Sequence, residues 1–421
     1  MNTLPGLELL FFLIVGECMA IVEVLNGCVA CGSKKLALVL DLGYQPLAND
    51  YLPSENSLEE FPLALNRCES CYHAQLSHSV NPERLFRNYS YVSGTSKTLF
   101  NYFEILRDKI FSRHGAAGKI LDVGSNDGTF LSVFKDTNWN CLGVDPAINL
   151  VAESAKLGVL TLPSFFNVPT AKLLASDFDV VVAMNVFAHS PNPLEVLQAI
   201  KLVLAESGTA YIQTSQANMF ENGEFDTVYH EHISFFNVKS MKSLLSRVGL
   251  YLNDVEFVSV HGNSYLWVIS HREESSDSVR ERENYETQLG LYGNSKYEEF
   301  AATAHSRVEQ VREIINDFRA KGFGIASYGA AAKGNTFINF GQFSLDYIYD
   351  DTPLKIGMHS PAGGSIVSNP DQMCSVEQPL LFVIPAWNFR EEILSNIRRR
   401  RSEGNDHTLT YFPQLRLEQL F

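Results

Sequence analysis

The sequence is poor in basic residues and has no repeat and no low-complexity tract. Its 421 residues include 33 Lys and Arg against 48 Asp and Glu, which gives a net charge of −15. A surface this acidic repels phosphate backbones, so we do not expect a nucleic acid as a partner. The balanced composition excludes collagen-like and disordered chains, and the length predicts roughly two to four domains.

Cysteine is also sparse. Three of the seven cysteines stand alone in the sequence: Cys18, Cys141 and Cys374. This is not the pattern of a secreted disulfide framework. We therefore expect a cytoplasmic protein in a reducing environment.

The other four cysteines form two Cys-x2-Cys pairs: Cys28 with Cys31, and Cys68 with Cys71. Two such pairs supply four thiolates from two tight turns, which is the ligand set of a tetrahedral Zn²⁺ site. The alternative is a group of incidental thiols or a disulfide. Because a loop-rich block of this size would fold poorly alone, we predict a structural zinc ion.

A long uncharged apolar span is missing as well. The mostly apolar stretch Leu7–Val22 is interrupted by Glu8 and Glu17, and no Lys or Arg precedes it. It is either a membrane anchor or a segment upstream of a start at Met19. We favour the second interpretation and expect no membrane partner.

Three blocks follow one another along the chain: residues 19–102, 103–271 and 272–421. The first is loop-rich, with a short strand before turns at Gly43 and Pro46. The second alternates strand-like and helical segments, as in a parallel sheet with crossover helices. The third begins with a polar helical stretch and continues as a similar unit. We predict an α/β protein with a small zinc-binding N-terminal domain, a Rossmann-like domain that binds S-adenosylmethionine (SAM), and a C-terminal Rossmann-like domain.

The second block contains a glycine-rich turn, KILDVGSNDGTF, that predicts the cofactor. Asp122 ends a strand, and Gly124 and Gly128 let the backbone approach a ligand at a helix N-terminus. Asp145 ends the next strand, where a carboxylate can accept both ribose hydroxyls. The pattern is not Gly-x-Gly-x-x-Gly, so SAM fits better than a nicotinamide, although a plain strand–helix turn is the alternative. The predicted cofactor-binding residues are Asp122, Gly124, Ser125, Asn126, Gly128, Asp145 and Asn185.

The order of motifs resembles the three-domain sugar C-methyltransferases of deoxysugar biosynthesis. The resemblance runs from about Asn26 to the C-terminal region. It rests on the cysteine tetrad, the Asp122–Gly128 turn, NVFAHSPNP at 185–193, VYHEHISFF at 228–236 and YGAAAKGNT at 328–336. It implies that the C-terminal domain helps to hold a nucleotide-diphosphate 4-keto sugar, which is methylated at C3, next to the ketone.

Methylation next to a ketone needs a base and a group that stabilises the enolate oxygen. The Tyr-His-Glu-His motif, which we expect just after a strand, supplies an imidazole that can act as a base near pH 7. The resemblance implies that His232 is the base, that Tyr229 and Glu231 order or polarise the sugar, and that His189 lies near the enolate oxygen. The alternative is that two of these histidines are satisfied loop residues.

The resemblance also implies an active-site tyrosine from the first block, which is either Tyr89 or Tyr91 in NYSYVSGTS. Packing between domains is the alternative role for each of them.

The third block has a turn of small residues, GAAAKGNT, that lets a phosphate approach the backbone. It is not a Walker A loop, because Gly334 rather than Ser or Thr follows Lys333. A tight packing turn is the alternative. The predicted substrate-binding residues are Tyr91, Gly329, Lys333, Asn335, Trp387 and Asn388. The string SPAGGSIVS at 360–368 departs from the family pattern and puts the identity of the sugar or the nucleotide in doubt.

The sequence therefore predicts a SAM-dependent C-methyltransferase of a nucleotide-diphosphate keto-sugar, either a monomer or a weak homodimer. One alternative keeps SAM and places the methyl group on a sugar hydroxyl. Another alternative is a non-catalytic, zinc-containing docking protein, against which the glycine turn and Asp145 argue.

Overall fold

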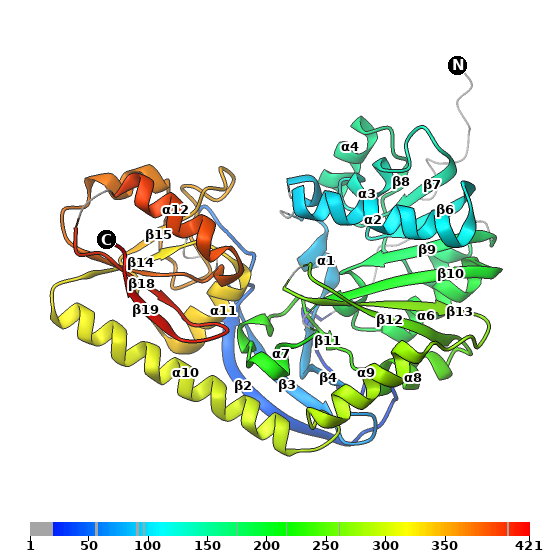
Figure 1. Ribbon diagram of the computed structural model, residues 1–421, viewed down its shortest axis with the longest axis horizontal. Coiled ribbons are helices and arrows are strands. Elements are labelled where there is room, and N and C mark those ends of the chain that lie inside the picture. Colours follow the sequence, from blue (N-terminus) through cyan, green and yellow to red (C-terminus); the bar gives the residue numbers. More distant parts are fainter. Residues whose placement is uncertain are drawn as a thin grey trace.

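The computed structural model describes residues 20–54, 58–89, 92–95, 97–174, 176–215, 217–260, 262–401 and 404–421. They form three blocks, and the chain passes from the first through the second to the third (Figure 1). Met19, the apolar segment before it and Tyr91 lie outside the described residues. Among the described helices, none is long and apolar enough to cross a membrane.

The N-terminal block contains a four-stranded antiparallel sheet. Its strands, in spatial order, are β11 (Ser234–Phe235), β4 (Ala74–Leu76), β3 (Glu60–Cys68) and β2 (Leu36–Pro46). The predicted short strand before Gly43 is longer, because a register shift between Asp41 and Tyr44 absorbs the glycine, whose φ is 74°, within β2. β11 follows the Tyr-His-Glu-His motif, so the motif precedes a strand and does not follow one as predicted.

Short elements surround this sheet and lead into the second block. They are β1 (Val22–Val24), which pairs with β5 (His78–Val80), then α1 (Pro82–Phe86), the 3-10 turn η3 (Ser93–Thr95) and α2 (Lys97–His114). The predicted boundary at residue 102 falls inside α2. Leu99, Phe103 and Leu106 of this helix pack in one cluster with Ile120 and Val180 of the central sheet. We therefore propose that the first block ends before α2.

The central sheet has seven strands and the predicted Rossmann-like order. From edge to edge they are β12 (Tyr251–Val258), β13 (Ser264–Ser270), β10 (Leu204–Ser215), β9 (Phe178–Met184), β6 (Ala117–Val123), β7 (Asn138–Val144) and β8 (Thr161–Leu162). The strands from β10 to β8 run parallel, and β13 is antiparallel to both of its neighbours. Residues 180–183 of β9 are at most 1% exposed, because helices cover both faces of a parallel sheet.

The helices of the central block are mostly short. They are α3 (Thr129–Ser132), α4 (Ile148–Lys156), α5 (Val168–Ala171), η4 (Phe187–His189), α6 (Pro193–Val203), α7 (Met219–Asn222), η5 (Phe225–Thr227) and α8 (Val238–Ser246). Asn192 caps α6 by accepting the backbone N–H of Glu195, and Pro193 occupies the first turn, where no N–H is needed.

The C-terminal block contains a second, six-stranded sheet. Its order is β16 (Val367–Ser368), β15 (Tyr347–Tyr349), β14 (Gly324–Tyr328), β17 (Leu380–Val383), β18 (His407–Thr410) and β19 (Arg416–Gln419). Only β19 is antiparallel to its neighbour. The helical elements are α11 (Ala332–Gly341), η6 (Pro370–Ser375), η7 (Trp387–Phe389) and α12 (Arg390–Arg400).

Two helices, α9 (Asp277–Gln288) and α10 (Ser295–Ala320), join the second and third blocks (Figure 1). α10 confirms the predicted polar helical stretch. Its apolar residues Val308, Val311, Ile315 and Phe318 are buried against the rest of the protein. α9 packs on β12 and α8, whereas α10 contacts β2, β14 and α11. The predicted boundary at residue 272 therefore lies within the packing of the central block, and we propose α10 as the start of the third.

Candidate active site

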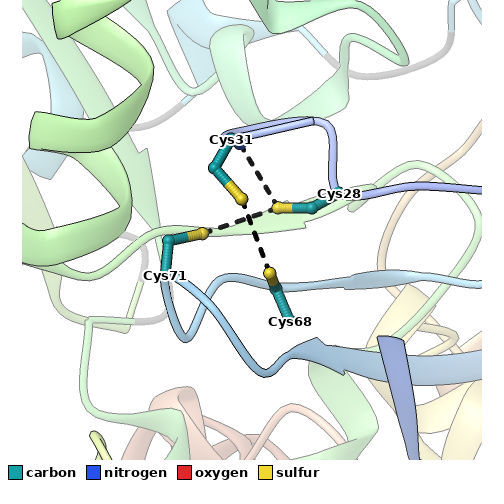
Figure 2. Close-up of side chains that lie close together, drawn as sticks. All are labelled: Cys28, Cys31, Cys68 and Cys71. Atoms are coloured by element: carbon teal, nitrogen blue, oxygen red, sulfur yellow. Dashed lines mark hydrogen bonds between the residues drawn. The ribbon is translucent and has the colours of Figure 1, made fainter. Parts of the chain in front are cut away.

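The four cysteines of the two pairs converge between two loops of the N-terminal block (Figure 2). The sulfur of Cys28 lies 3.5 Å from that of Cys71, and the sulfur of Cys31 lies 3.6 Å from that of Cys68. These separations exclude disulfides, whose sulfurs are about 2.0 Å apart. They are close to the roughly 3.8 Å edge of a tetrahedron with Zn–S bonds of about 2.3 Å. The cluster fits one structural zinc ion.

Contacts tie this cysteine cluster to the central block. Arg247, at the end of α8, donates to the carbonyl oxygen of Ala30 over 2.7 Å. Asn237, which caps the start of α8, donates to the carbonyl oxygen of Tyr72 over 2.7 Å. The cluster therefore also holds the helix that follows β11.

The predicted cofactor turn lies at the carboxyl ends of the central strands. The strand order reverses between β6 and β9, and ligands of open α/β sheets bind in the crevice at such a point. The turn after β6 brings Gly124, Gly128 and Asn126 there, while Asp145 follows β7 and Asn185 follows β9.

The glycines and two orphaned polar atoms fit a bound nucleoside. Gly124 and Gly128 have φ of 72° and 79°, and a Cβ on Gly128 would lie 2.9 Å from the Cβ of Ser154. The Ser125 hydroxyl and the Asn185 side-chain oxygen are buried and have no hydrogen-bond partner among the described residues. Such atoms are rare unless a ligand or water completes them.

Asp145 holds the turn in shape. Its two carboxylate oxygens accept the backbone N–H groups of Asn126 and Ala147, each over 2.8 Å. Burial raises the pKa of Asp145, and these two hydrogen bonds counter the rise. Burial, and then the charge of Asp145, hold the pKa of Asp122 well above its ordinary value.

The 3-10 turn η3 lies against the cofactor turn, which the sequence did not reveal. The backbone N–H of Ser93 donates to the side-chain oxygen of Asn126, and that of Gly94 donates to the carboxylate of Asp127, each over 3.0 Å. A Cβ on Gly94 would lie 2.7 Å from that carboxylate, so only glycine allows this approach.

Aromatic rings from three segments form a row beside this crevice. The ring of His232 lies 4.0 Å from that of Tyr229 and 5.2 Å from that of His189, centroid to centroid. His189, in the turn after β9, stacks in turn on Phe86 of α1 at 5.7 Å. The structure thus brings together three of the predicted catalytic residues.

The tautomer of His232 follows from its backbone contact. Its Nδ1 lies 2.8 Å from the carbonyl oxygen of Thr227. Because a carbonyl oxygen only accepts, Nδ1 carries the hydrogen, and in the neutral ring the lone pair is on Nε2. The neighbouring His230 is different: its Nε2 donates to the carbonyl oxygen of Phe61, and burial lowers its pKa to about 4.

Glu231 is buried between two donors from the N-terminal block. Asn49 donates to one of its carboxylate oxygens over 2.6 Å, and the Tyr89 hydroxyl donates to the other over 2.9 Å. Tyr89 therefore reaches the predicted catalytic residues. Burial raises the pKa of Glu231, while the two hydrogen bonds hold it down.

A second buried acid joins the central and C-terminal blocks. Asp226 is fully buried, and its carboxylate accepts the indole N–H of Trp387 over 3.0 Å and the hydroxyl of Tyr411 over 3.4 Å. The ammonium group of Lys333 lies 4.7 Å from the centre of the Trp387 ring. Two predicted substrate-binding residues thus lie together, beside an acid that we did not predict.

The other predicted substrate-binding residues are placed differently. Gly329, with φ of 107°, turns the chain between β14 and α11. Asn388 is exposed and lines a surface hollow with Trp387. Asn335 is 2% exposed, and its side chain bonds within the protein.

Comparison with protein families assigns all three blocks. Residues 28–86 match a zinc binding domain, residues 97–255 a methyltransferase domain and residues 259–413 a C-methyltransferase C-terminal domain. The C-methyltransferase NovU of Streptomyces niveus is 29% identical over 399 residues, which are 91% of this chain and 95% of that protein. The chain belongs to the SAM-dependent C-methyltransferases that carry an N-terminal zinc-binding domain.

Two further proteins match part of this C-methyltransferase. The tRNA U34 carboxymethyltransferase of Dichelobacter nodosus is 32% identical over 157 residues, which are 34% of this chain and 46% of that protein. A solved structure of the 1,6-didemethyltoxoflavin-N1-methyltransferase of Burkholderia thailandensis is 16% identical, with a TM-score of 0.33. That match covers 43% of this chain and 80% of the other.

The C-methyltransferase uses SAM as the methyl donor, and the cysteine cluster is its zinc site. Sequence reasoning missed Asn49 and Asp226, which contact the predicted site residues Glu231 and Trp387. It also missed Tyr411, which donates a hydrogen bond to Asp226. The only sequence signal for Asp226 was a short stretch with two acids, NGEFDTV, just before the motif.

Proposed function

We propose that this enzyme transfers the methyl group of SAM to a carbon next to the ketone of a nucleotide-diphosphate 4-keto deoxysugar, at C3. The observation that carries the proposal is the fixed tautomer of His232 between the rings of Tyr229 and His189. A base with a defined lone pair, held beside a SAM crevice, suits the removal of a weakly acidic C–H proton.

His232 takes the proton from C3 on Nε2, and the electron pair of the C–H bond becomes the enolate. That pair then forms the new C–C bond with the methyl carbon, while the pair of the broken S–CH₃ bond stays on sulfur. SAM supplies the electrophilic methyl group. The Nδ1–H bond to Thr227 stabilises the imidazolium that forms, because a carbonyl oxygen faces the positive ring.

His189 and Tyr229 are the proposed contacts of the enolate oxygen, since both rings lie against His232. A hydrogen-bond donor aimed at a developing negative charge lowers the barrier to enolisation. Glu231 and Tyr89, bonded to each other, are proposed to order the sugar hydroxyls and so to set which face of the enolate meets the methyl group.

Lys333 is the proposed partner of the diphosphate. Two buried acids, Asp226 and Glu224, lie within electrostatic reach of its ammonium group. A lysine charge at this turn matters on a protein of net charge −15, which otherwise repels a nucleotide sugar. We expect the enzyme in the cytoplasm, where thiolate ligands stay reduced.

The direct test is to incubate the purified enzyme with SAM and a panel of nucleotide-linked 4-keto sugars, and to detect the methylated product by mass spectrometry. A substrate deuterated at C3 must lose the label during C-methylation, whereas methylation of a hydroxyl keeps it. A product that retains the label would overturn the carbon assignment. No product from any member of the panel, with zinc-replete folded enzyme, would overturn the proposal.

A further inference from the structure

Asn49 lies in the segment that follows β2 and donates a short hydrogen bond to Glu231. Its amide nitrogen is 2.6 Å from one carboxylate oxygen, and hydrogen bonds to ionised acceptors are shorter than neutral ones. Tyr89 occupies the other oxygen at 2.9 Å. Each carboxylate oxygen thus has its own donor, and the orientation of the group is fixed from both sides.

The segment that carries Asn49 is held by the C-terminal block. The carbonyl oxygen of Ala48 accepts the amide of Asn335 over 2.8 Å. The hydroxyl of Tyr51 donates to the carbonyl oxygen of Ala330 over 2.5 Å and accepts from Asn335 over 2.9 Å. Residues 48 and 51, on either side of Asn49, are therefore both clamped by the start of the C-terminal helix α11 and the turn before it.

Further hydrogen bonds extend this clamp. The backbone of Leu52 exchanges hydrogen bonds with that of His359 over 3.2 and 2.7 Å. The oxygen of the Asn335 side chain accepts the hydroxyl of Ser360 over 3.3 Å. The polar atoms of Asn335 are thereby engaged inside the protein, and a direct bond to substrate is not needed to explain this residue.

We propose that Asn49 is a positioning residue that aligns Glu231, and that Asn335 and Tyr51 of the clamp fix Asn49. The inference rests on the proposed function, because it assigns Glu231 to the sugar and the turn after β14 to the diphosphate. It means that the block that holds the nucleotide end of the substrate also sets the geometry at the reacting end. Neither Asn49 nor Asn335 touches the reacting atoms.

The physical reason lies in the burial of Glu231. A carboxylate that is 4% exposed loses most of its water, so its charged form depends on the donors that replace water. Removing the Asn49 donor leaves one oxygen unpaired, which favours the protonated form and frees the side chain to turn. Both changes reduce the fraction of enzyme in which Glu231 can orient the sugar.

The first test measures Glu231 directly. In protein labelled with ¹³C-glutamate, the Glu231 signal is assigned by its loss in Glu231→Gln and is then titrated in Asn49→Leu. We expect the pKa of Glu231 to rise by about one unit, the size expected for one lost hydrogen bond to a charged group. The matched control is Asp50→Asn, which removes the negative charge of the ion pair with Arg84 in the same segment and should leave the titration of Glu231 unchanged.

The second test measures turnover. We expect Asn49→Leu to lower kcat at least about tenfold, with KM and the affinity for S-adenosylhomocysteine nearly unchanged. Tyr51→Phe, which loses the bond to Ala330, should lower kcat in the same way but less. Asn49→Asp has the same shape and turns the donor into a repelling acceptor, so it replaces the leucine variant if that variant does not fold.

The outcomes of these tests distinguish the positioning role of Asn49 from the proposed function. An unchanged pKa of Glu231 in both Asn49 variants overturns the inference, whether or not any sugar is turned over. An effect on KM alone also overturns it. A raised pKa in an enzyme that methylates no keto-sugar supports the role of Asn49 and counts against the proposed function instead.

Discussion

Trp387 of the C-terminal block donates its indole N–H to the carboxylate of Asp226 in the central block over 3.0 Å. The acceptor is fully buried, and its second oxygen has no partner among the described residues. Burial raises the pKa of Asp226 from 3.8 to about 7, against the opposing effects of Lys333, Trp387 and Tyr411. The joint between the two blocks therefore contains an acid that changes its charge near neutral pH.

This acid predicts how stability depends on pH. Because folding raises its pKa, the folded protein holds the Asp226 proton more tightly than the unfolded chain does. The stabilisation of the folded state by this proton is complete below pH 4 and is lost as the pH rises to about 7. The full shift of the pKa corresponds to about 4 kcal/mol in the free energy of unfolding. We expect the melting temperature of Asp226→Asn to rise relative to that of the wild type as the pH increases from 5 to 8.

Thermal unfolding across that range is the measurement. Asp371→Asn is the control, because Asp371 is exposed and bonds to Arg400 on the surface. Its melting temperature should stay at a constant offset from that of the wild type. The same constant offset for Asp226→Asn would show that Asp226 does not titrate in this range.

The cofactor site leads to a prediction for S-adenosylhomocysteine. Asp145 both braces the glycine turn and is the proposed acceptor of the ribose hydroxyls. Replacing it by alanine removes charged hydrogen bonds of about 1.5–3 kcal/mol each, so the Kd should rise at least about tenfold. Calorimetric titration measures this change, with the exposed Asp108→Ala as the control. Equal affinity in the two variants would remove Asp145 from the cofactor site.

The sequence revealed the parts of the site that have a local pattern. The apolar runs of β6 and β9, the turn from Gly124 to Gly128 and each Cys-x2-Cys pair are short segments, which can be recognised without knowing how the blocks pack. Asn49 has no such pattern, because its partner Glu231 lies 182 positions away. That contact depends on how the blocks pack together, and no local propensity encodes it.

The same reason explains the two strand predictions that differ from the structure. β11 has two residues and exists because Ser234 and Phe235 pair with Gln75 and Ala74 of the first block. β2 continues past Gly43 because β3 pairs with it on both sides of the bulge. A turn residue in the sequence ended the predicted strand, and tertiary pairing overrode it.

His232 has a prediction of its own. His232→Gln keeps the size and polarity of the side chain but cannot accept a proton near pH 7. It should reduce the exchange of the C3 hydrogen of the keto-sugar with D₂O by at least about a hundredfold, the usual contribution of a general base. Binding of S-adenosylhomocysteine should persist. The control is His305→Gln, at an exposed histidine, which should catalyse the exchange at the wild-type rate. NMR measures the exchange. A wild-type rate in His232→Gln would show that another residue is the base.

Lys333 predicts the affinity for thymidine diphosphate. Lys333→Met keeps an unbranched apolar side chain at this position and loses the charge that lies over Trp387. One charged hydrogen bond to phosphate is worth about 1.5–3 kcal/mol, so the Kd should rise about tenfold or more, and salt should weaken binding less than in the wild type. Lys321→Met removes an exposed lysine charge elsewhere and serves as the control in calorimetry. Unchanged affinity in Lys333→Met would place the diphosphate outside the turn after β14.

The cysteine cluster predicts what zinc does for the rest of the molecule. Cys71→Ser removes one ligand, and the two loops then lose the ion that holds them together. Because Arg247 and Asn237 of the α8 region bond to these loops, we expect the damage to spread to β11 and the catalytic motif. Metal analysis should find one zinc ion per wild-type chain and much less in the variant, with a lower melting temperature and a greater loss of methyl transfer than of S-adenosylhomocysteine binding. Cys374→Ser, at an exposed thiol in the C-terminal block, should change none of these. A variant without zinc that keeps the wild-type melting temperature would show that the two loops keep their arrangement without metal.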